Sequence, residues 1–312
     1  MSINPLGLKD LLGLKDLSAA QLGLIIERAF SYKKDFGSLG KIKKSLAEKN
    51  ILTLFYEPST RTLTSFSVAA GRLGGRVNNV SISGSSIQKG ETLIDTVRNL
   101  EVMGFSALII RHTHGGAPQL AADNTSMSVI NAGDGFNEHP TQALLDIMTM
   151  QQYKGELKKK KIVIVGDIAH SRVARSNIWG LLTLGAEVTV SAPATLIPSG
   201  IEELGVKVEF DLDRALADAD FVNVLRMQYE RQSDQNFIPS KREYHRLFGI
   251  NDKRLARAKK NLLVLHPGPI NRSVEISSSI ADGKQNVILE QVVNGIAVRM
   301  AIMDLLIGAE NA

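Results

Sequence analysis

The sequence lacks cysteine altogether and is poor in aromatic residues and in long apolar runs. Without cysteine, disulfides and thiolate metal sites are excluded. No apolar run approaches the roughly 20 residues needed to cross a bilayer, and residues 1–10 lack the basic region and apolar core of a signal peptide. These absences predict a cytoplasmic protein with no membrane-spanning segment.

The sequence also has no large excess of positive or of negative charge. The chain carries 37 Lys and Arg against 32 Asp and Glu, a formal net charge of +5. Such an excess is compatible with nucleic-acid binding, but five Tyr and one Trp offer little for base stacking, and the longest basic run, residues 158–161, directly precedes a predicted strand. A positive cleft that concentrates small anions explains the charge equally well, so we expect small anionic substrates and no nucleic acid.

Signals for metals and nucleotide cofactors are missing too. No His-x-x-x-His spacing and no cluster of carboxylates occurs, which argues against a catalytic metal. Residues 166–172 follow a predicted strand, but they contain one glycine where the dinucleotide fingerprint requires three. We therefore expect neither a metal nor a cofactor.

What the sequence does contain is a regular alternation of short apolar runs with helical segments. Such β/α alternation predicts mostly parallel sheets covered by helices on both faces, and 312 residues suit two domains of ordinary size. The predicted fold class is α/β, with two domains that each hold a mostly parallel sheet flanked by helices. The predicted strands are residues 51–56, 107–110, 128–131, 162–165, 187–191, 221–225 and 262–265.

The division between the domains is predicted near the helical segment 139–150, which a polar turn at 154–156 follows. We assign residues 1–140 to the first domain and residues 141–291 to the second. The closing segment 292–312 begins as a strongly apolar helix pattern, and we expect it to pack back on the first domain.

The most informative segment is residues 57–67, EPSTRTLTSFS, which follows one predicted strand and leads into the predicted helix 64–73. Its Ser-Thr-Arg-Thr cluster offers hydroxyls, free backbone N–H groups, the positive end of a helix dipole and a guanidinium in one place. These groups favour a phosphate site. The alternative is that Ser59 or Thr60 serves only as a helix cap, which needs one such residue rather than three around an arginine.

Other predicted strands end in similar residues. In open α/β sheets, ligands bind beyond the carboxyl ends of the strands. Four of five such ends bring an arginine, so we expect a site that faces several anionic groups at once. The five ends are residues 59–62, 111–112, 167–172, 226–228 and 266–269.

Five motifs in register make the chain resemble the aspartate carbamoyltransferase catalytic chains. They are residues 58–62 (PSTRT), 88–92 (QKGET), 139–142 (HPTQ), 226–228 (RMQ) and 266–272 (HPGPINR). The resemblance runs nearly end to end. It implies attack of the L-aspartate amine on the carbonyl carbon of carbamoyl phosphate, giving N-carbamoyl-L-aspartate and phosphate, an early step of pyrimidine synthesis. It also implies that the first domain binds carbamoyl phosphate and the second binds aspartate.

The resemblance also implies roles for individual residues. The residues implied for carbamoyl phosphate are Ser59, Thr60, Arg61, Thr62, Arg111, His139, Gln142, Pro267 and Gly268. Those implied for aspartate are Lys89, Arg172, Arg226 and Gln228, and those implied for catalysis are Arg61, Thr62, Arg111, His139 and Lys89. Glu57 and Arg231 match residues that pair when the domains close. The family pattern further implies a cis peptide bond at Gly268–Pro269.

Lys89 lies in the polar stretch 81–90, which on sequence alone reads as a surface loop. In the family this loop reaches into the site of a neighbouring subunit, so the resemblance implies a homotrimer with shared sites. Whether regulatory chains or a dihydroorotase join it stays open. Ser67 and Ser273 depart from the common family pattern, at positions that touch no substrate.

Two rival functions remain. Ornithine carbamoyltransferases share the phosphate motif, but they carry a cysteine in the loop that corresponds to 266–269, whereas this chain has none and offers Arg226 and Gln228 for a dicarboxylate. A non-catalytic anion-binding protein on the same fold would not need His139, Gln142 and Lys89 all intact. Their presence favours a transferase for aspartate.

Overall fold

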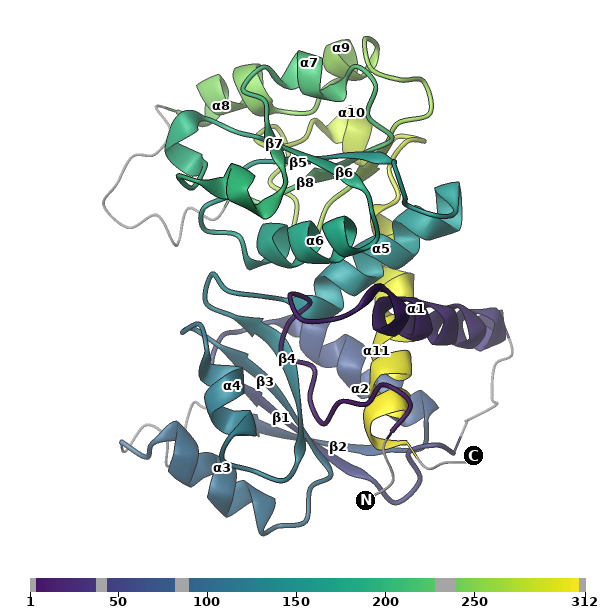
Figure 1. Ribbon diagram of the computed structural model, residues 1–312, viewed down its shortest axis with the longest axis vertical. Helices are drawn as coiled ribbons and strands as arrows, with labels where there is room; N and C mark the ends of the chain where they lie inside the picture. The colour runs from purple at the N-terminus through teal and green to yellow at the C-terminus, as the bar shows by residue number, and fades with distance from the viewer. Residues whose placement is uncertain (1–3, 38–43, 82–89, 228–239, 309–312) are drawn as a thin grey trace. The chain divides into compact units, whose positions relative to one another are not determined.

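The computed structural model describes residues 4–37, 44–81, 90–227 and 240–308. The chain forms two compact units: Met1–Met148 with Val293–Ala312, and Thr149–Val292. Both boundaries fall inside helices, α5 (Pro140–Lys154) and α11 (Ile288–Ile307) (Figure 1). The units divide after Met148 and again at Val293, whereas the sequence assigned residues 1–140 and 141–291 to the two domains. The division of the two substrates between these units stays a prediction.

The first unit contains a four-stranded parallel sheet in the order β2-β1-β3-β4. Its strands are β1 (Asn50–Phe55), β2 (Arg76–Ser81), β3 (Ala107–His112) and β4 (Ser128–Asp134). All seven residues of β4 are buried, as are four of the six in β1 and in β3, which is the burial expected when helices cover both faces of a parallel sheet.

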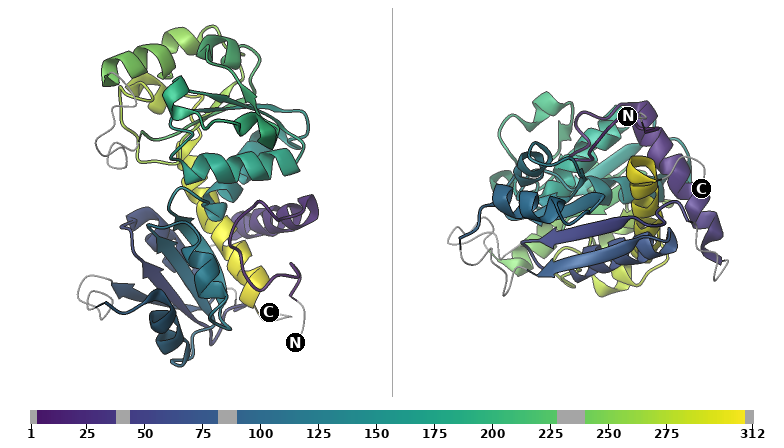
Figure 2. Two further views of the ribbon diagram at one scale, coloured as in Figure 1. Left: turned by 60° about the vertical axis from the view of Figure 1, so that its left-hand side comes forward. Right: turned by 90° about the horizontal axis from the view of Figure 1, so that it is seen from below.

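Helices cover the two faces of this sheet. Helices α3 (Leu93–Glu101) and α4 (Ala117–Ala122) pack on one face, where Leu52, Leu54 and Val97 belong to one buried cluster. Helices α1 (Ala19–Lys34), α2 (Thr60–Arg72) and α11 lie together on the other side of the sheet (Figures 1 and 2). The part of α11 from Val293 onward belongs to this first unit.

The second unit contains a five-stranded parallel sheet in the order β7-β6-β5-β8-β9. Its strands are β5 (Lys161–Val165), β6 (Glu187–Ser191), β7 (Lys207–Val208), β8 (Phe221–Val224) and β9 (Leu263–Leu265). Its helices are α6 (Arg172–Thr183), α7 (Leu212–Leu216), α8 (Lys241–Phe248), α9 (Asp252–Leu255) and α10 (Ser278–Ala281). Short 3₁₀ segments occur at η1 (Asp35–Gly37) in the first unit and at η3 (Ala194–Leu196) and η4 (Ile201–Leu204) in the second.

The predicted fold class, α/β with two parallel sheets flanked by helices, is confirmed. Each of the seven predicted strands corresponds to an observed one within a few residues. Over the described ranges, no helix has both the length and the apolar character needed to cross a membrane.

Candidate active site

Both sheets have a point at which the strand order reverses direction. In the first unit the chain passes from β1 outward to β2 and then returns to β3 on the other side of β1. In the second unit β6 and β7 lie to one side of β5, and β8 and β9 lie to the other. Loops that leave the two strands at such a point diverge and open a crevice at the carboxyl edge. The crevices are therefore expected between the loops after β1 and β3, and between those after β5 and β8.

The residues predicted to bind phosphate lie just beyond the carboxyl end of β1, at the start of α2. Helix α2 begins four residues earlier than predicted, so Ser59 is its N-cap and the Thr60, Arg61 and Thr62 residues form its first turn. The Ser59 Oγ accepts the Thr62 N–H at 3.4 Å and donates to the Thr62 Oγ1 at 2.9 Å. Thr60 and Arg61 are exposed, whereas Thr62 is buried. The capping alternative is thus correct for Ser59, and the phosphate role of Thr60, Arg61 and Thr62 stays a prediction.

Arg111 lies near the carboxyl end of β3, the strand that pairs with β1. The register of the two strands pairs Phe55 with Arg111, which places Glu57 beside the end of β3. The Arg111 Nη2 lies 3.3 Å from the Glu57 Oε2, and the Arg111 Nη1 donates to the Ala132 carbonyl at 3.3 Å. Both side chains of the pair are only about 15% exposed, so water screens it weakly. The Glu57 carboxylate thus holds the Arg111 guanidinium at the carboxyl edge of the sheet. The expected partner Arg231 lies outside the described residues.

His139 and Gln142 stand at the start of α5, beyond the end of β4. The His139 carbonyl accepts the Gln142 N–H at 3.0 Å, which makes His139 the residue from which the helix starts. Both side chains are buried, and the Gln142 Nε2 donates to the Asp146 Oδ1 at 2.9 Å. Upstream, the Glu138 Oε2 accepts the Leu14 N–H at 2.7 Å. These bonds fix the approach to the helix on both sides of His139.

In the second unit, Arg172 and Arg226 flank the reversal point between β5 and β8. Ser171 caps α6 by accepting the Ala174 N–H at 3.1 Å, so Arg172 is the first residue of that helix, and its side chain is buried. Arg226 follows β8 by two residues and is half-buried. Gly166 lets the two loops approach each other, because its φ is +130° and a Cβ there would lie 2.9 Å from the Leu225 Cβ.

The loop after β9 is held by a buried acid–histidine pair. The His266 Nδ1 accepts the Gly268 N–H at 2.8 Å, so the proton of the neutral ring resides on Nε2, which lies 3.2 Å from the Glu275 Oε1. Neither side chain of this pair is exposed. The Glu275 Oε1 also accepts the Asn271 N–H at 2.6 Å, and the Asn271 Nδ2 donates to the Met227 carbonyl at 3.2 Å. The loops after β8 and β9 are thereby tied together.

The expected cis bond at Gly268–Pro269 is present. Pro267 and Gly268 lie in this same loop, between His266 and Asn271, at the carboxyl edge of the second sheet.

Sequence reasoning missed Glu275 and Asp146. The sequence signal for Glu275 is its place as a lone acid between Val274 and Ile276. Apolar neighbours indicate burial, and a buried acid is seldom found without a partner, so a paired carboxylate could have been expected there. Asp146 gives a similar signal, since it is an acid on a helix whose neighbouring positions are apolar.

The structure thus groups the predicted residues by unit. The first unit brings Ser59, Thr60, Arg61, Thr62, Arg111, His139 and Gln142 to the carboxyl edge of its sheet, and the second brings Arg172, Arg226, Pro267 and Gly268 to the same edge of its own. The predicted residues Lys89 and Gln228 lie outside the described residues. Within the parts of the chain that are described, no group of three or more His, Asp or Glu side chains is arranged to hold a metal ion.

Two family models match the chain. Residues 9–152 match the carbamoyl-phosphate-binding domain of the aspartate/ornithine carbamoyltransferases, and residues 158–306 match the Asp/Orn-binding domain of the same family. Solved structures agree in fold. One is aspartate transcarbamoylase from Trypanosoma cruzi in complex with carbamoyl aspartate and phosphate, with a TM-score of 0.87 at 30% identity over 96% of each chain. Another is ornithine carbamoyltransferase from Pyrococcus furiosus, with a TM-score of 0.86 at 29% identity over 96% of this chain and 97% of that one.

The fold is shared by aspartate and ornithine carbamoyltransferases, but the following two sequence relatives are both aspartate carbamoyltransferases. The aspartate carbamoyltransferase catalytic subunit of Ruminiclostridium cellulolyticum is 55% identical over 96% of this chain and 95% of its own length. The corresponding subunit of Moorella thermoacetica is 54% identical over 97% of this chain and 98% of its own length. With this similarity over nearly its whole length, the chain belongs to the family of aspartate carbamoyltransferase catalytic subunits.

Proposed function

We propose that this chain transfers the carbamoyl group of carbamoyl phosphate to the amino group of L-aspartate. The products are N-carbamoyl-L-aspartate and phosphate, and the reaction belongs to de novo pyrimidine biosynthesis. The observation that carries the proposal is the sorting of anion-binding groups between two crevices. Hydroxyls with one arginine surround a helix N-terminus in the first unit, and two arginines flank the reversal point in the second.

The first set suits carbamoyl phosphate. We assign Ser59, Thr60, Arg61 and Thr62 to the phosphate, because first-turn N–H groups and hydroxyls can bind its oxygens while the guanidinium balances its charge. The Thr62, Arg111 and His139 side chains are assigned to the carbonyl oxygen. Gln142 and the carbonyls of Pro267 and Gly268 are assigned to the carbamoyl NH₂.

The chemistry proceeds by addition and elimination. The aspartate nitrogen attacks the carbonyl carbon, and the C=O electron pair moves to the oxygen, where the donors of Thr62, Arg111 and His139, with Arg61 also near, stabilise the negative charge. The pair then returns as the bond from carbon to the phosphate oxygen breaks. The departing phosphate accepts the proton that the amine loses, so His139 acts as a hydrogen-bond donor and no side-chain base is required.

The second set suits a dicarboxylate. Arg172 and Arg226 offer planar guanidinium groups, which bind carboxylates through paired hydrogen bonds. We assign Gln228 and Lys89 to the same substrate on the strength of the family resemblance. An ornithine side chain is cationic and would be repelled by these arginines.

We further propose a homotrimer in which Lys89 serves the site of a neighbouring subunit, in the cytoplasm as the sequence predicted. Regulatory or dihydroorotase chains are possible additions to such a trimer.

A direct assay tests the proposed reaction. Purified protein is supplied with labelled carbamoyl phosphate and either L-aspartate or L-ornithine, and the carbamoylated products are separated. We expect N-carbamoyl-L-aspartate and no citrulline. Citrulline as the main product would contradict the substrate assignment, and release of phosphate without either product would contradict the transfer.

A further inference from the structure

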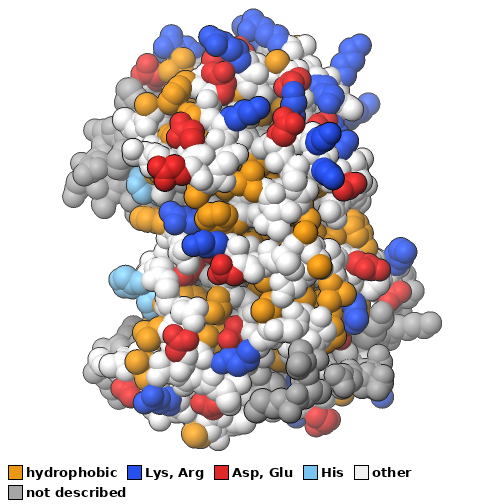
Figure 3. Space-filling view, in the orientation of Figure 1, with side chains coloured by type: hydrophobic (Ala, Val, Ile, Leu, Met, Phe, Trp, Pro, Cys, Tyr) orange, Lys and Arg blue, Asp and Glu red, His pale blue; other side chains and the backbone are white. Residues whose placement is uncertain are grey.

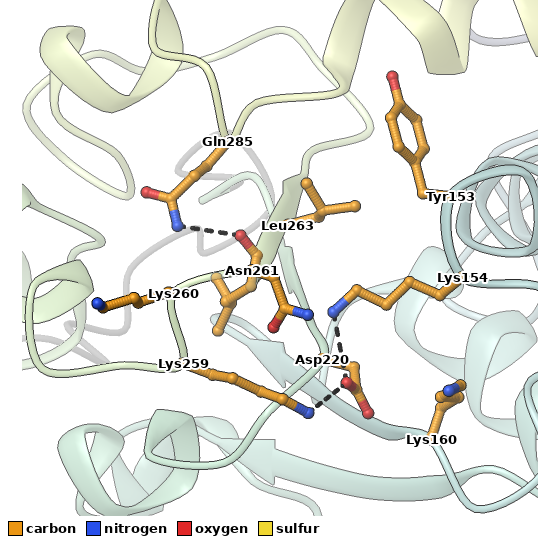
Figure 4. A pocket seen from close by; sticks show the side chains of 10 residues that line it. Tyr153, Lys154, Lys160, Asp220, Lys259, Lys260, Asn261, Leu263 and Gln285 are labelled. Atoms are coloured by element: carbon orange, nitrogen blue, oxygen red, sulfur yellow. Dashed lines mark hydrogen bonds and ion pairs between the residues drawn. The ribbon is translucent and has the colours of Figure 1, made fainter.

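A polar cavity lies at the amino edge of the second unit's sheet. It has a volume of about 520 Å³ and is lined by residues at the amino ends of three neighbouring strands, among them Lys160 before β5, Asp220 before β8 and Leu263 at the start of β9 (Figure 4). Because the strands are parallel, this edge is opposite to the one that carries Arg172 and Arg226. The cavity is therefore separate from the proposed aspartate site.

The charges around the cavity are unbalanced. Among the described residues that line it, Lys154, Lys160, Lys259 and Lys260 are cationic and Asp220 is the single acid. Figure 4 shows Lys154 and Lys259 pointing at Asp220, whose Oδ1 lies 3.3 Å and 2.6 Å from their respective Nζ atoms. The Asp220 Oδ2 is already used, because it accepts the Lys161 N–H at 3.1 Å. One carboxylate thus serves two ammonium groups, and two more lysines stand nearby.

The excess of lysines contributes to pKa shifts of Lys154 and Asp220. Desolvation lowers the pKa of Lys154, the Asp220 carboxylate opposes that effect, and repulsion from Lys259 and Lys160 lowers the pKa further. Burial would raise the pKa of Asp220, but hydrogen bonds from Lys259 and the Lys161 N–H and the charge of Lys154 lower it overall. The outer surface of this unit shows many other Lys and Arg side chains, although acids are interspersed among them there (Figure 3). The cavity differs in having a single acid for four lysines.

Polar groups without charge complete the lining. Tyr153, Asn261 and Gln285 also line the cavity, and their side chains carry hydrogen-bond donors, of which the Gln285 Nε2 already donates to the Leu262 carbonyl at 3.1 Å. A volume of this size suits a small molecule, since ligand pockets commonly measure about 300–1,000 Å³. Lysine ammonium groups bind phosphate as point charges and need no fixed bidentate geometry.

We propose that this cavity, lined by Lys154, Lys160, Asp220, Lys259 and Lys260, binds a small anion that carries two or more phosphate groups. The anion supplies the negative charge that balances the four lysines, which the single Asp220 carboxylate does not balance. Its phosphates contact Lys160 and Lys260, for which the described residues provide no carboxylate within ion-pair distance, and they share Lys154 and Lys259 with Asp220.

Inorganic pyrophosphate is the probe for this site. It is titrated calorimetrically into the purified protein after the proposed active site has been saturated with N-(phosphonacetyl)-L-aspartate, so that the groups near Arg61 are occupied. We expect one pyrophosphate per chain and weaker binding of inorganic phosphate. No heat of binding at millimolar pyrophosphate, or equal affinity for the two anions, would overturn the proposal.

Variants locate the binding. The Lys160→Gln/Lys260→Gln double variant should weaken pyrophosphate binding by about three- to tenfold, the range expected for two partly exposed charges. The Lys158→Gln/Lys253→Gln variant removes the same charge from exposed positions of the same unit that do not line the cavity, and its affinity should stay within about twofold. Equal weakening in both variants would show general electrostatic attraction and refute a defined site.

A third variant should act in the opposite direction. Asp220→Asn keeps an oxygen that can accept the Lys161 N–H but removes the competing charge, so it should bind pyrophosphate more tightly than the unmodified chain. A thermal melt checks that this variant is folded. If it is folded and binds pyrophosphate more weakly, the anion does not share the lysines of Asp220 and the proposed site is wrong. The lysine variants keep the test decisive if Asp220→Asn does not fold.

Discussion

The arginines of the candidate site differ in burial. That difference decides whether replacing one of them tests the chemistry alone or disturbs folding as well. Arg172 is 4% exposed, so its removal would leave buried partners unsatisfied and disturb folding as well as binding. Arg61 is exposed on the first turn of α2, where its removal should cost little stability. Arg61 therefore gives the cleaner test of chemistry.

Arg61→Ala should lower kcat by roughly 10²–10³-fold, because it removes a donor from both the departing phosphate and the developing oxyanion. Steady-state kinetics measures the loss. A free energy of unfolding within about 0.5 kcal/mol of that of the unmodified protein, obtained from a thermal melt, shows that the fold is kept. Near-normal turnover in a folded Arg61→Ala protein would refute the phosphate assignment.

Arg226→Ala should raise the KM for aspartate far more than the KM for carbamoyl phosphate, since its guanidinium is assigned to a substrate carboxylate. Arg175→Ala is the matched control, because Arg175 is an exposed arginine on α6 of the same unit. It should change neither constant. Equal increases of both constants in Arg226→Ala would assign this arginine to folding or to loop position instead.

At the scale of elements, the sequence predicted the inner strands and the edge strands β4 and β9, and it missed the other two edge strands. Residues 187–191 were predicted as a strand and form β6, and residues 107–110 match the start of β3. The strands β2 and β7 escaped prediction, and both are at sheet edges. The sequence of β2, RVNNVS, is polar because much of an edge strand faces solvent, so no apolar run marks it.

The candidate site shows the same limit. Motifs on the loops after β1 and β8 were found because hydroxyls and arginines next to a strand end are visible in sequence, whereas the roles of Pro267 and Gly268 after β9 came from the family resemblance. The Glu275–His266 pair was not found, because the two residues are nine positions apart within the loop after β9, and only the folded loop brings Glu275 to the imidazole and the Gly268 N–H to its Nδ1. A loop conformation of this kind leaves no periodic signal in the sequence.

Gly166→Ala should affect both stability and aspartate binding. A φ of +130° strains any residue with a Cβ, and the added methyl would lie 2.9 Å from the Leu225 Cβ, next to Arg226. We expect a loss of roughly 1–3 kcal/mol in unfolding free energy, measured with urea, together with a raised KM for aspartate.

Gly185→Ala is the control for that change. Gly185 also has a positive φ, +74°, but its nearest neighbour is the Lys158 side chain at 3.4 Å, at the amino edge of the sheet. It should lose stability and keep its KM. If Gly166→Ala lost stability but kept its KM for aspartate, the close approach of the two loops would be irrelevant to binding.

At the scale of the whole molecule, the two units are joined through continuous helices. Helix α5 starts at Pro140, next to His139, in the first unit and ends at Lys154 in the second, and α11 likewise contributes to both. One chain thus supplies the groups assigned to carbamoyl phosphate and the two arginines assigned to aspartate. The remaining assigned cation, Lys89, is the one that the family resemblance attributes to a neighbouring subunit.

Mixed oligomers test that attribution. If Lys89 acts across a subunit boundary while His139 acts within its own chain, a site that receives Lys89 from a His139→Ala chain and His139 from a Lys89→Gln chain contains both intact residues. Each variant alone should be nearly inactive, and reassembled hybrids should recover part of the activity, measured per site on hybrids whose composition mass spectrometry has verified. Hybrids that stay inactive would place both residues in the same chain's site and refute the shared-site model. A Lys89→Gln protein that is fully active alone would show instead that Lys89 takes no part in the reaction.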